Sequence, residues 1–315
     1  MVFDEHPLKD LYRMVVWGPY RRLMEAAPPG VEIRASRRLG RLVCKRSPDR
    51  RELLRTHLRD GIGEHPNLDR MVRECFETHF ANQYVGFTFG KVTEANWESF
   101  LQIQGRKHLD AAVAQGRGVV VAHPHMSLPQ LPLHVLGLLD YDVHQIGGGK
   151  PDVVLSKTGE KVAAIRAGLE SRIRATLHDG TAYIRPILRA LRDGAVVFTA
   201  CDGTGGGHEL GRREVVDVLG RRMRLPVFAI WAGLRLKVPV VPMVPWRNHM
   251  SGARYMCRFE QPLELKGSHK NDADIQAGLE QLASRFERWL RQHPGDWHFW
   301  DKWTTDEGGL LVVDA

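Results

Sequence analysis

The sequence predicts an α/β fold, with a mostly parallel central sheet flanked by helices and an N-terminal helical region. From about residue 106 onward, short apolar runs that indicate buried strands alternate with helical segments, which is typical of parallel sheets with helical connections. Before that point the pattern is helical and basic. We therefore expect an N-terminal helical region over residues 1–105 and an α/β core over residues 106–315, together in one continuous domain.

The N-terminal region begins with a basic amphipathic stretch. Leu8–Met24 mixes apolar residues with Lys and Arg around Trp17, a pattern that fits a helix lying on an anionic membrane. Gly18-Pro19 interrupts this stretch, which fits equally well two short helices packed on the protein. Further helices are predicted after the start signal Ser47-Pro48-Asp49 and over Asn67–Tyr84.

The core follows as an alternation of strands and helices. We predict strands over Val119–Ala122, Tyr141–Ile146, Ala195–Ala200, Val215–Leu219, Val238–Val244 and Arg254–Phe259, the last of them exposed. We predict helices over 106–115, Leu131–Leu139, Lys161–Leu177, Ile184–Arg192, Pro226–Leu234 and Asp272–Gln292.

Composition and charge narrow the class of protein. The net charge of +8 and the pI of about 9.5 suit phosphate-bearing partners, which include nucleic acid, anionic lipid headgroups, coenzyme A and acidic carrier proteins. The four cysteines are scattered without a CxxC pair, so neither a zinc site nor a disulfide framework is predicted. No window reaches ~18 uninterrupted apolar residues, and no signal peptide is recognised. We expect a cytoplasmic protein.

The stretch from Gly116 to Gln130 contains the first candidate catalytic residues. The apolar run Val119–Ala122 ends in two histidines, His123 and His125, that are separated by a proline. Open α/β sheets place their chemistry at the carboxyl ends of strands. The alternative is that both are loop histidines with backbone partners, because histidine has many roles outside catalysis.

Four stretches share their order with one known family. They are HLDAAVAQGRGVVVAHPH, ALRDGAVVFTACDGTGGG, VDVLGRRMRLPVFAIWAGLRLKVPVVPMVPWR and HPGDWHFWDKW. They resemble, in turn, the strand leading to a catalytic histidine, a strand ending in an Asp-rich loop, an FFGR-type segment with a helix and strand, and a Trp-rich ending. From about residue 35 to 305, the chain therefore resembles the lysophospholipid acyltransferase superfamily, in particular its bacterial lipid A biosynthesis (lauroyl/myristoyl) acyltransferase branch.

The resemblance implies a catalytic histidine followed five residues later by Asp or Glu. In the register that we prefer, the histidine is His125, the general base, and the fifth residue on is Gln130. The other register pairs His123 with Leu128; we retain His123 as a substrate-binding candidate. Gln130 can accept a hydrogen bond from an imidazole, but it cannot supply the negative charge of the family acid.

Further positions carry over from the family. Lys150 stands where the family often has an Arg-Pro pair and is an expected anion contact. Asp202 and Thr204 occupy the Asp-x-Asp type loop; Asp202 either orients His125 in place of the missing acid or caps the loop. Arg221 follows the FFG-like segment and is either a phosphate or oxyanion ligand or an ordinary solvated arginine.

The resemblance implies an acyltransferase that moves an acyl group from a CoA or acyl-carrier-protein thioester to a hydroxyl or amine of a lipid or glycolipid acceptor. No metal or other cofactor is implied beyond the acyl-CoA or acyl-ACP co-substrate. We also expect peripheral contact with the anionic inner membrane and no nucleic-acid partner. Two alternatives stay open: the same chemistry on a soluble or carrier-bound metabolite, and a catalytically inactive homologue that binds acyl chains or carriers.

Overall fold

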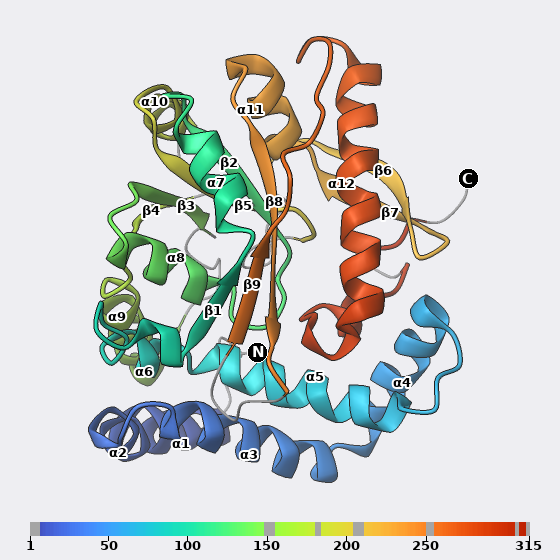
Figure 1. The fold of residues 1–315 in the computed structure, drawn as a ribbon. Helices are drawn as coiled ribbons and strands as arrows, with labels where there is room; N and C mark the ends of the chain where they lie inside the picture. Colours follow the sequence, from blue (N-terminus) through green and yellow to red (C-terminus); the bar gives the residue numbers. More distant parts are fainter. Residues whose placement is uncertain are drawn as a thin grey trace.

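The computed structural model describes residues 7–147, 155–179, 184–203, 211–249, 255–305 and 309–312. It confirms the predicted α/β class: a seven-stranded, mostly parallel sheet carries helices on both faces, and helices of the N-terminal region lie beneath it in Figure 1. Within the described residues, no helix combines the length and the apolar composition needed to cross a bilayer.

The helices alternate with strands as expected. The helices are α1 (Pro7–Val15), α2 (Arg21–Ala26), α3 (Val31–Arg46), α4 (Pro48–Ile62), α5 (Leu68–Gln83), α6 (Gly86–Phe89), α7 (Arg106–Val113), α8 (Gln130–Leu138), α9 (Lys157–Glu170), α10 (Arg185–Arg192), α11 (Phe228–Leu236) and α12 (Asp272–Gln292). The strands are β1 (Leu101–Gln104), β2 (Val119–His123), β3 (Val143–Gly147), β4 (Thr176–Asp179), β5 (Val196–Ala200), β6 (Arg213–Val218), β7 (Arg221–Pro226), β8 (Val240–Arg247) and β9 (Tyr255–Phe259).

The main sheet has the strand order β1-β9-β8-β2-β5-β3-β4. Strands β8, β2, β5, β3 and β4 are parallel to one another, whereas β9 is antiparallel to β8 and parallel to β1. Strands β6 and β7 form a separate antiparallel hairpin. The carboxyl ends of the five parallel strands therefore share one edge, which lies at the bottom of Figure 1, where β8 ends next to α5.

Strand β2 is buried on both faces because its apolar side chains pack into two hydrophobic clusters, one on each face of the sheet. Val119 and Val121 pack with α7 and α8, whereas Val120 and Ala122 pack with α11 and α12. Side chains alternate across a strand, so a strand covered on both faces is apolar at every position. This burial holds the end of β2, and the histidines that follow it, in a rigid frame.

The N-terminal stretch packs on the protein as two short helices, as one of the two interpretations expected, but Gly18-Pro19 does not interrupt it. Helix α1 continues through a π-turn, Val16–Tyr20, directly into α2, and the backbone N–H of Arg21 donates to the carbonyl of Val16, five residues back. A π-turn accommodates a proline inside a helix because it relaxes the local hydrogen-bond pattern. Trp17, expected at a membrane, is buried against Tyr84 and Phe87 instead.

Two further expectations about elements were wrong. The predicted helix Lys161–Leu177 ends at Glu170, and the residues after it form β4, because β3 offers an unpaired edge to Thr176–Asp179. The strand Arg254–Phe259 was expected to be exposed. Its described part, β9, is buried except at Arg258, because β1 and β8 flank it.

Candidate functional site

The candidate site lies where two neighbouring strands end. Strands β2 and β5 are parallel partners, and His123 is in register with Ala200. His125 and Asp202 each lie two residues beyond that pair along their own chains. Equal spacing from a shared register brings the two side chains together at the carboxyl edge of the sheet, where open α/β sheets hold their functional groups.

His125 and Asp202 form a close hydrogen-bonded pair. The ring Nδ1 of His125 lies 2.8 Å from Oδ1 of Asp202. A carboxylate can only accept, so Nδ1 carries the proton, and Nε2 of the neutral ring keeps its lone pair. The His125 side chain is 25% exposed, whereas that of Asp202 is completely buried. The basic nitrogen thus belongs to a partly exposed ring.

Three donors hold the buried Asp202 carboxylate. Besides the His125 ring, Oδ2 accepts from the backbone N–H of His125 and from the indole N–H of Trp297, each at 2.8 Å. Burial by itself would raise the pKa of Asp202, but the nearby His125 and these hydrogen bonds outweigh burial and hold the pKa below its ordinary value. Asp202 therefore accepts hydrogen bonds from both the backbone N–H and the ring of His125.

The segment after α12 completes the walls of the site. The backbone N–H of His298 donates to the carbonyl of His125 at 3.0 Å, and the ring of Phe299 lies 4.9 Å from that of His125. A Cβ at Gly203 would come within 2.3 Å of the Phe299 ring, so only glycine fits beside it. Sequence reasoning noticed the Trp-rich ending as a family feature but did not place Trp297, His298 or Phe299 in the site.

His123 lies inside the protein. Its side chain is buried, its ring centroid is 6.3 Å from that of His125, and its Nδ1 lies 3.2 Å from the carbonyl of Pro124. Burial lowers the pKa of His123 to about 4, so the ring is neutral at physiological pH. Of the two histidines, only His125 combines an exposed ring with a carboxylate partner.

Gln130 begins α8 and is partly exposed. No hydrogen bond joins its amide to His125 among the described residues. The position of the family acid in sequence is therefore not the position from which a carboxylate contacts the imidazole here; that carboxylate comes from the end of β5.

Arg221 is not brought to this pair. Arg221 is largely exposed on β7 and forms an ion pair with Asp60 of α4, to which Trp303 also donates at 2.8 Å. This pairing raises the pKa of the Arg221 guanidinium and lowers that of Asp60. Lys150 and Thr204 lie outside the described residues.

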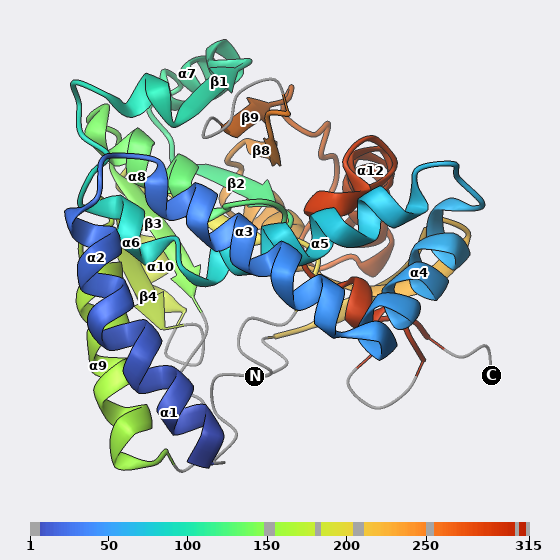
Figure 2. The same ribbon diagram turned by 90° about the horizontal axis from the view of Figure 1, so that it is seen from below.

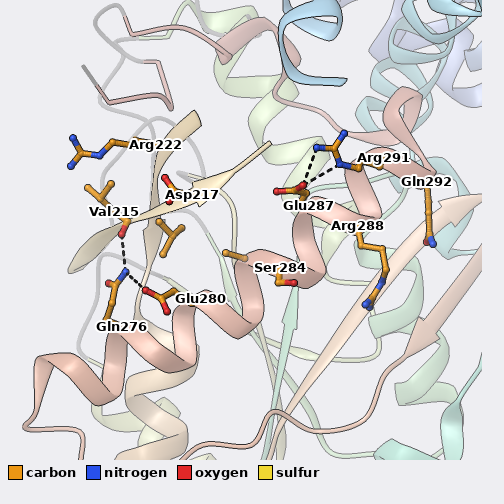
Figure 3. Close-up of a pocket in the computed structure, with 12 residues that line it drawn as sticks. Val215, Asp217, Arg222, Gln276, Glu280, Ser284, Glu287, Arg288, Arg291 and Gln292 are labelled. Carbon is orange, nitrogen blue, oxygen red and sulfur yellow. Dashed lines mark hydrogen bonds and ion pairs between the residues drawn. The ribbon is translucent and has the colours of Figure 1, made fainter. Parts of the chain in front are cut away.

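A separate groove of about 750 Å³ lies between the β6–β7 hairpin and α12 (Figure 3). Several of its polar side chains bond neighbouring groups of the groove. Gln276 donates to the carbonyl of Val215 and to Glu280, and Arg291 pairs with Glu287. None of its lining residues belongs to the His125 pair. Elsewhere among the described residues, no group of three or more His, Cys, Asp or Glu side chains is arranged to hold a metal ion.

Comparison with known proteins identifies the family to which the chain belongs. The family model described as bacterial lipid A biosynthesis acyltransferase matches residues 19–304, a range that contains His125, Asp202 and Trp297. A search of curated proteins found no match. An imidazole held by a buried carboxylate is suited to removing a proton from an attacking hydroxyl or amine. The chain thus belongs to the bacterial lipid A biosynthesis acyltransferase family and is an acyltransferase that acts on a lipid acceptor.

Proposed function

We propose that the chain transfers an acyl group from a CoA or acyl-carrier-protein thioester to a hydroxyl or amine of its lipid acceptor, with His125 as general base and Asp202 as its orienting acid. One observation carries this proposal: the 2.8 Å hydrogen bond between Nδ1 of His125 and the buried Asp202 carboxylate. The thioester is a co-substrate, and the proposed chemistry requires no further cofactor.

The proposed reaction is a proton-assisted acyl transfer. Nε2 of His125 removes the proton of the acceptor hydroxyl or amine while the acceptor oxygen or nitrogen attacks the thioester carbonyl. Asp202 stabilises the imidazolium that forms. When the tetrahedral intermediate collapses, the carbon–sulfur bond breaks, the new ester or amide bond remains, and the imidazolium returns its proton to the thiolate.

The charge of Asp202 favours an active enzyme over an inactive homologue. Gln130 would leave the imidazolium without a counter-charge, and loss of such a charge costs on the order of 10⁴ in rate in a serine protease triad. Asp202 supplies a carboxylate whose lowered pKa keeps it ionised at neutral pH. The acid is then displaced along the chain, from α8 to the end of β5, rather than lost.

We also propose that the α1–α2 helix and α3 contact an anionic membrane surface, as peripheral attachment to the inner membrane would require. The outward side of α1–α2 carries exposed apolar residues, among which Leu11 is 56% and Leu23 is 63% exposed. The buried side, which includes Trp17, packs on α5 and α6, and α1 lies along α9 (Figure 2). An amphipathic helix that is fixed on one side and apolar on the other is suited to lie in a membrane interface.

Helix α3 supplies the charge for such a contact. Arg34, Arg38, Lys45 and Arg46 are exposed and have no carboxylate partner within the described part of the chain. Both α1–α2 and α3 lie at the end of the molecule where the parallel strands end (Figures 1 and 2). A membrane bound there would present a lipid acceptor on the same side as His125.

The proposal is tested by offering lauroyl and myristoyl thioesters of CoA and of acyl carrier protein with two kinds of acceptor. One acceptor is a lipid A precursor in vesicles, and the other is a set of soluble hydroxyl and amine compounds. Mass spectrometry of the acylated product identifies the donor and acceptor. We expect transfer to the lipid, and His125→Ala should reduce the rate by at least about 10³-fold while the variant still binds the thioester.

Gln130→Leu is the matched control, because Gln130 follows the same loop and no hydrogen bond joins it to the His125 ring among the described residues. It should retain the rate of the parent within about threefold. A His125→Ala variant that is folded and as active as the parent would rule out the proposed base. Transfer to soluble acceptors alone would move the substrate from a lipid to a metabolite.

A further inference from the structure

The chain segment after α12 pairs with the residues that carry His125. Met126 and Trp297 form an isolated antiparallel β-bridge. The backbone N–H of Ser127 donates to the carbonyl of Asp296 at 2.7 Å, and the backbone N–H of His298 donates to the carbonyl of His125. The ring Nε2 of His298 also donates to the carbonyl of Ser127 at 2.8 Å. We call residues 296–299 the C-terminal clamp.

We infer that Trp297 of this clamp is a positioning residue for acyl transfer: its indole N–H fixes the Asp202 carboxylate so that the other oxygen faces the ring of His125. The inference rests on the proposed roles of His125 and Asp202. It adds a residue that touches neither substrate nor base and acts through the acid alone.

The geometry explains why a second donor on Oδ2 matters. A carboxylate can rotate about its last side-chain bond, and this torsion is broad and roughly two-fold. Two donors from different directions, the backbone N–H of His125 and the indole of Trp297, hold Oδ2 in place. Oδ1 is then left for Nδ1 of His125. Without the indole N–H, one donor remains on Oδ2 and the carboxylate is free to turn.

Trp297 is itself held rigidly. It is buried, and its ring makes edge-on contacts with Trp300 at 4.9 Å, with Phe286 at 5.7 Å and with Trp303 at 6.0 Å between centroids. A ring enclosed on several sides cannot move its N–H away from the carboxylate without repacking the cluster. The tryptophan cluster thereby restricts movement of the indole N–H that donates to Asp202.

The other tryptophans of the cluster provide matched controls. Trp300 is equally buried, but its indole N–H donates to the carbonyl of Pro294 at 2.7 Å. Trp303 donates to Asp60. Replacing any of the three by Phe removes one indole hydrogen bond and a similar volume from the same core. Only the change at Trp297 removes a donor from Asp202.

The ionisation of Asp202 also depends on the titratable groups that face it. These are His125 on the loop after β2, His123 at the end of β2, His298 in the clamp and Cys201 next in the chain. His123 and His298 are buried, and burial lowers the pKa of each to about 4. Both rings are therefore neutral near pH 7.

The first test uses proton NMR of the full-length protein and needs no turnover. A His–carboxylate hydrogen bond gives a downfield proton resonance, which His125→Gln and Asp202→Asn should abolish and so assign. We expect Trp297→Phe to shift this resonance upfield or broaden it by exchange with water. Trp300→Phe and Trp303→Phe should leave it in place. An unchanged resonance in a folded Trp297→Phe variant would overturn the inference.

A second measurement uses the wild-type protein, in case Trp297→Phe does not fold. Labelling with 15N-tryptophan gives signals from eight indoles, and the Trp300 and Trp303 signals are identified by their loss in the Phe variants. A further indole signal should shift when the pH is lowered far enough to protonate Asp202, whose pKa lies below its ordinary value, and the downfield proton should disappear with it. If no indole signal follows the protonation of Asp202, Trp297 does not hold the ionised acid.

Kinetics then separate positioning from stability. Loss of one hydrogen bond to a charged group corresponds to a rate loss of about 10-fold to 100-fold. Trp297→Phe should lower kcat by that factor while KM changes less than about twofold, and the two control variants should stay within about threefold in kcat. If the parent itself transfers no acyl group, the proposed function fails, while the NMR result still decides whether Trp297 holds Asp202.

Discussion

The carboxylate that bonds the ring of His125 belongs to Asp202, which follows β5. The pattern looks for an acid five residues after His125 and finds Gln130. The fold brings a carboxylate from the end of β5, which is parallel to β2 and in register with it. The imidazole needs a nearby negative charge, and the charge can come from any element that reaches Nδ1.

Asp202→Asn should therefore lower kcat by about 10³-fold to 10⁴-fold, because Asn can accept the ring hydrogen bond but cannot stabilise the imidazolium. The Gln130→Glu variant should be only slightly faster than the parent, since no hydrogen bond joins Gln130 to the His125 ring within the described residues. Thioester-dependent product formation measures both. Strong rescue of Asp202→Asn by Gln130→Glu would instead identify residue 130 as an alternative acid position.

Asp296 is a buried carboxyl whose charge works against folding. Burial raises the pKa of Asp296 to about 6, even though the backbone N–H of Arg247 donates to it at 3.1 Å. The folded pKa lies above the unfolded one, so the folded state binds the extra proton between about pH 4 and pH 6. The parent therefore loses stability as pH rises through that window.

Asp296→Asn should be more stable than the parent at pH 8, by about 3 kcal/mol in the free energy of unfolding, because the amide avoids burying a charge. The gain should shrink as pH falls toward 4.5. Urea unfolding at the two pH values measures it. A variant that is less stable at pH 8 would mean that Arg247 needs the ionised carboxylate.

At the scale of elements, the corner between α2 and α3 depends on a buried ion pair. Lys91 donates to the carbonyl of Ala27 at 2.7 Å and to Glu32 at 3.0 Å, and it also reaches the carbonyl of Met24. Glu32 in turn accepts from the backbone N–H of Gly30, before α3. Lys91 thus satisfies carbonyls at the end of α2, and Glu32 an amide at the start of α3.

Lys91→Met should destabilise the protein by about 3 kcal/mol, because it leaves a buried carboxylate without its cation. Lys45→Met is the control: Lys45 is exposed on α3 and has no carboxylate partner among the described residues, so its loss should cost almost nothing. Urea denaturation compares the two. Equal stability of the Lys91 variant and its control would show that the pair adds no net stability.

The elements that the sequence predicted poorly are those whose neighbours decide their state. Thr176–Asp179 becomes a strand because β3 provides a partner, although the helical pattern continues through these residues. Helix α1 and α2 join through a π-turn that packs Trp17 on an aromatic cluster. Helix α12, by contrast, begins and ends where its pattern predicted, since its apolar stripe repeats over the whole helix.

At the scale of the whole molecule, the net charge is +8, and several of the exposed basic residues lie on α3. Helix α3, which carries exposed arginines and Lys45, lies at the same end of the molecule as α1–α2 and the carboxyl edge of the sheet (Figures 1 and 2). Basic residues near an anionic surface contribute about 1 kcal/mol each at physiological salt. The same attraction weakens when salt screens it.

We expect the protein to cosediment with vesicles containing anionic phospholipid, to bind neutral vesicles weakly, and to dissociate at high salt. Arg34→Gln with Arg38→Gln should lower the partition coefficient about 30-fold, as expected for about 2 kcal/mol. Leu11→Ser with Leu23→Ser should also weaken binding, by loss of buried apolar area. Leu177→Ser, an exposed leucine on edge strand β4, is the control. Binding that no salt concentration changes would exclude an electrostatic contact.

The sequence alone determined the fold class, most element positions and the identity of His125 as a candidate base. Those follow from local patterns: valine runs for buried strands, periodic leucines for helices, and a histidine at a strand end. Only the tertiary structure decided which acid faces His125, that Trp297 holds this acid, that Trp17 is buried and that Arg221 pairs with Asp60. These contacts join residues 67 to 161 positions apart in sequence, and strand register and helix packing, which a single sequence does not encode locally, set their distances.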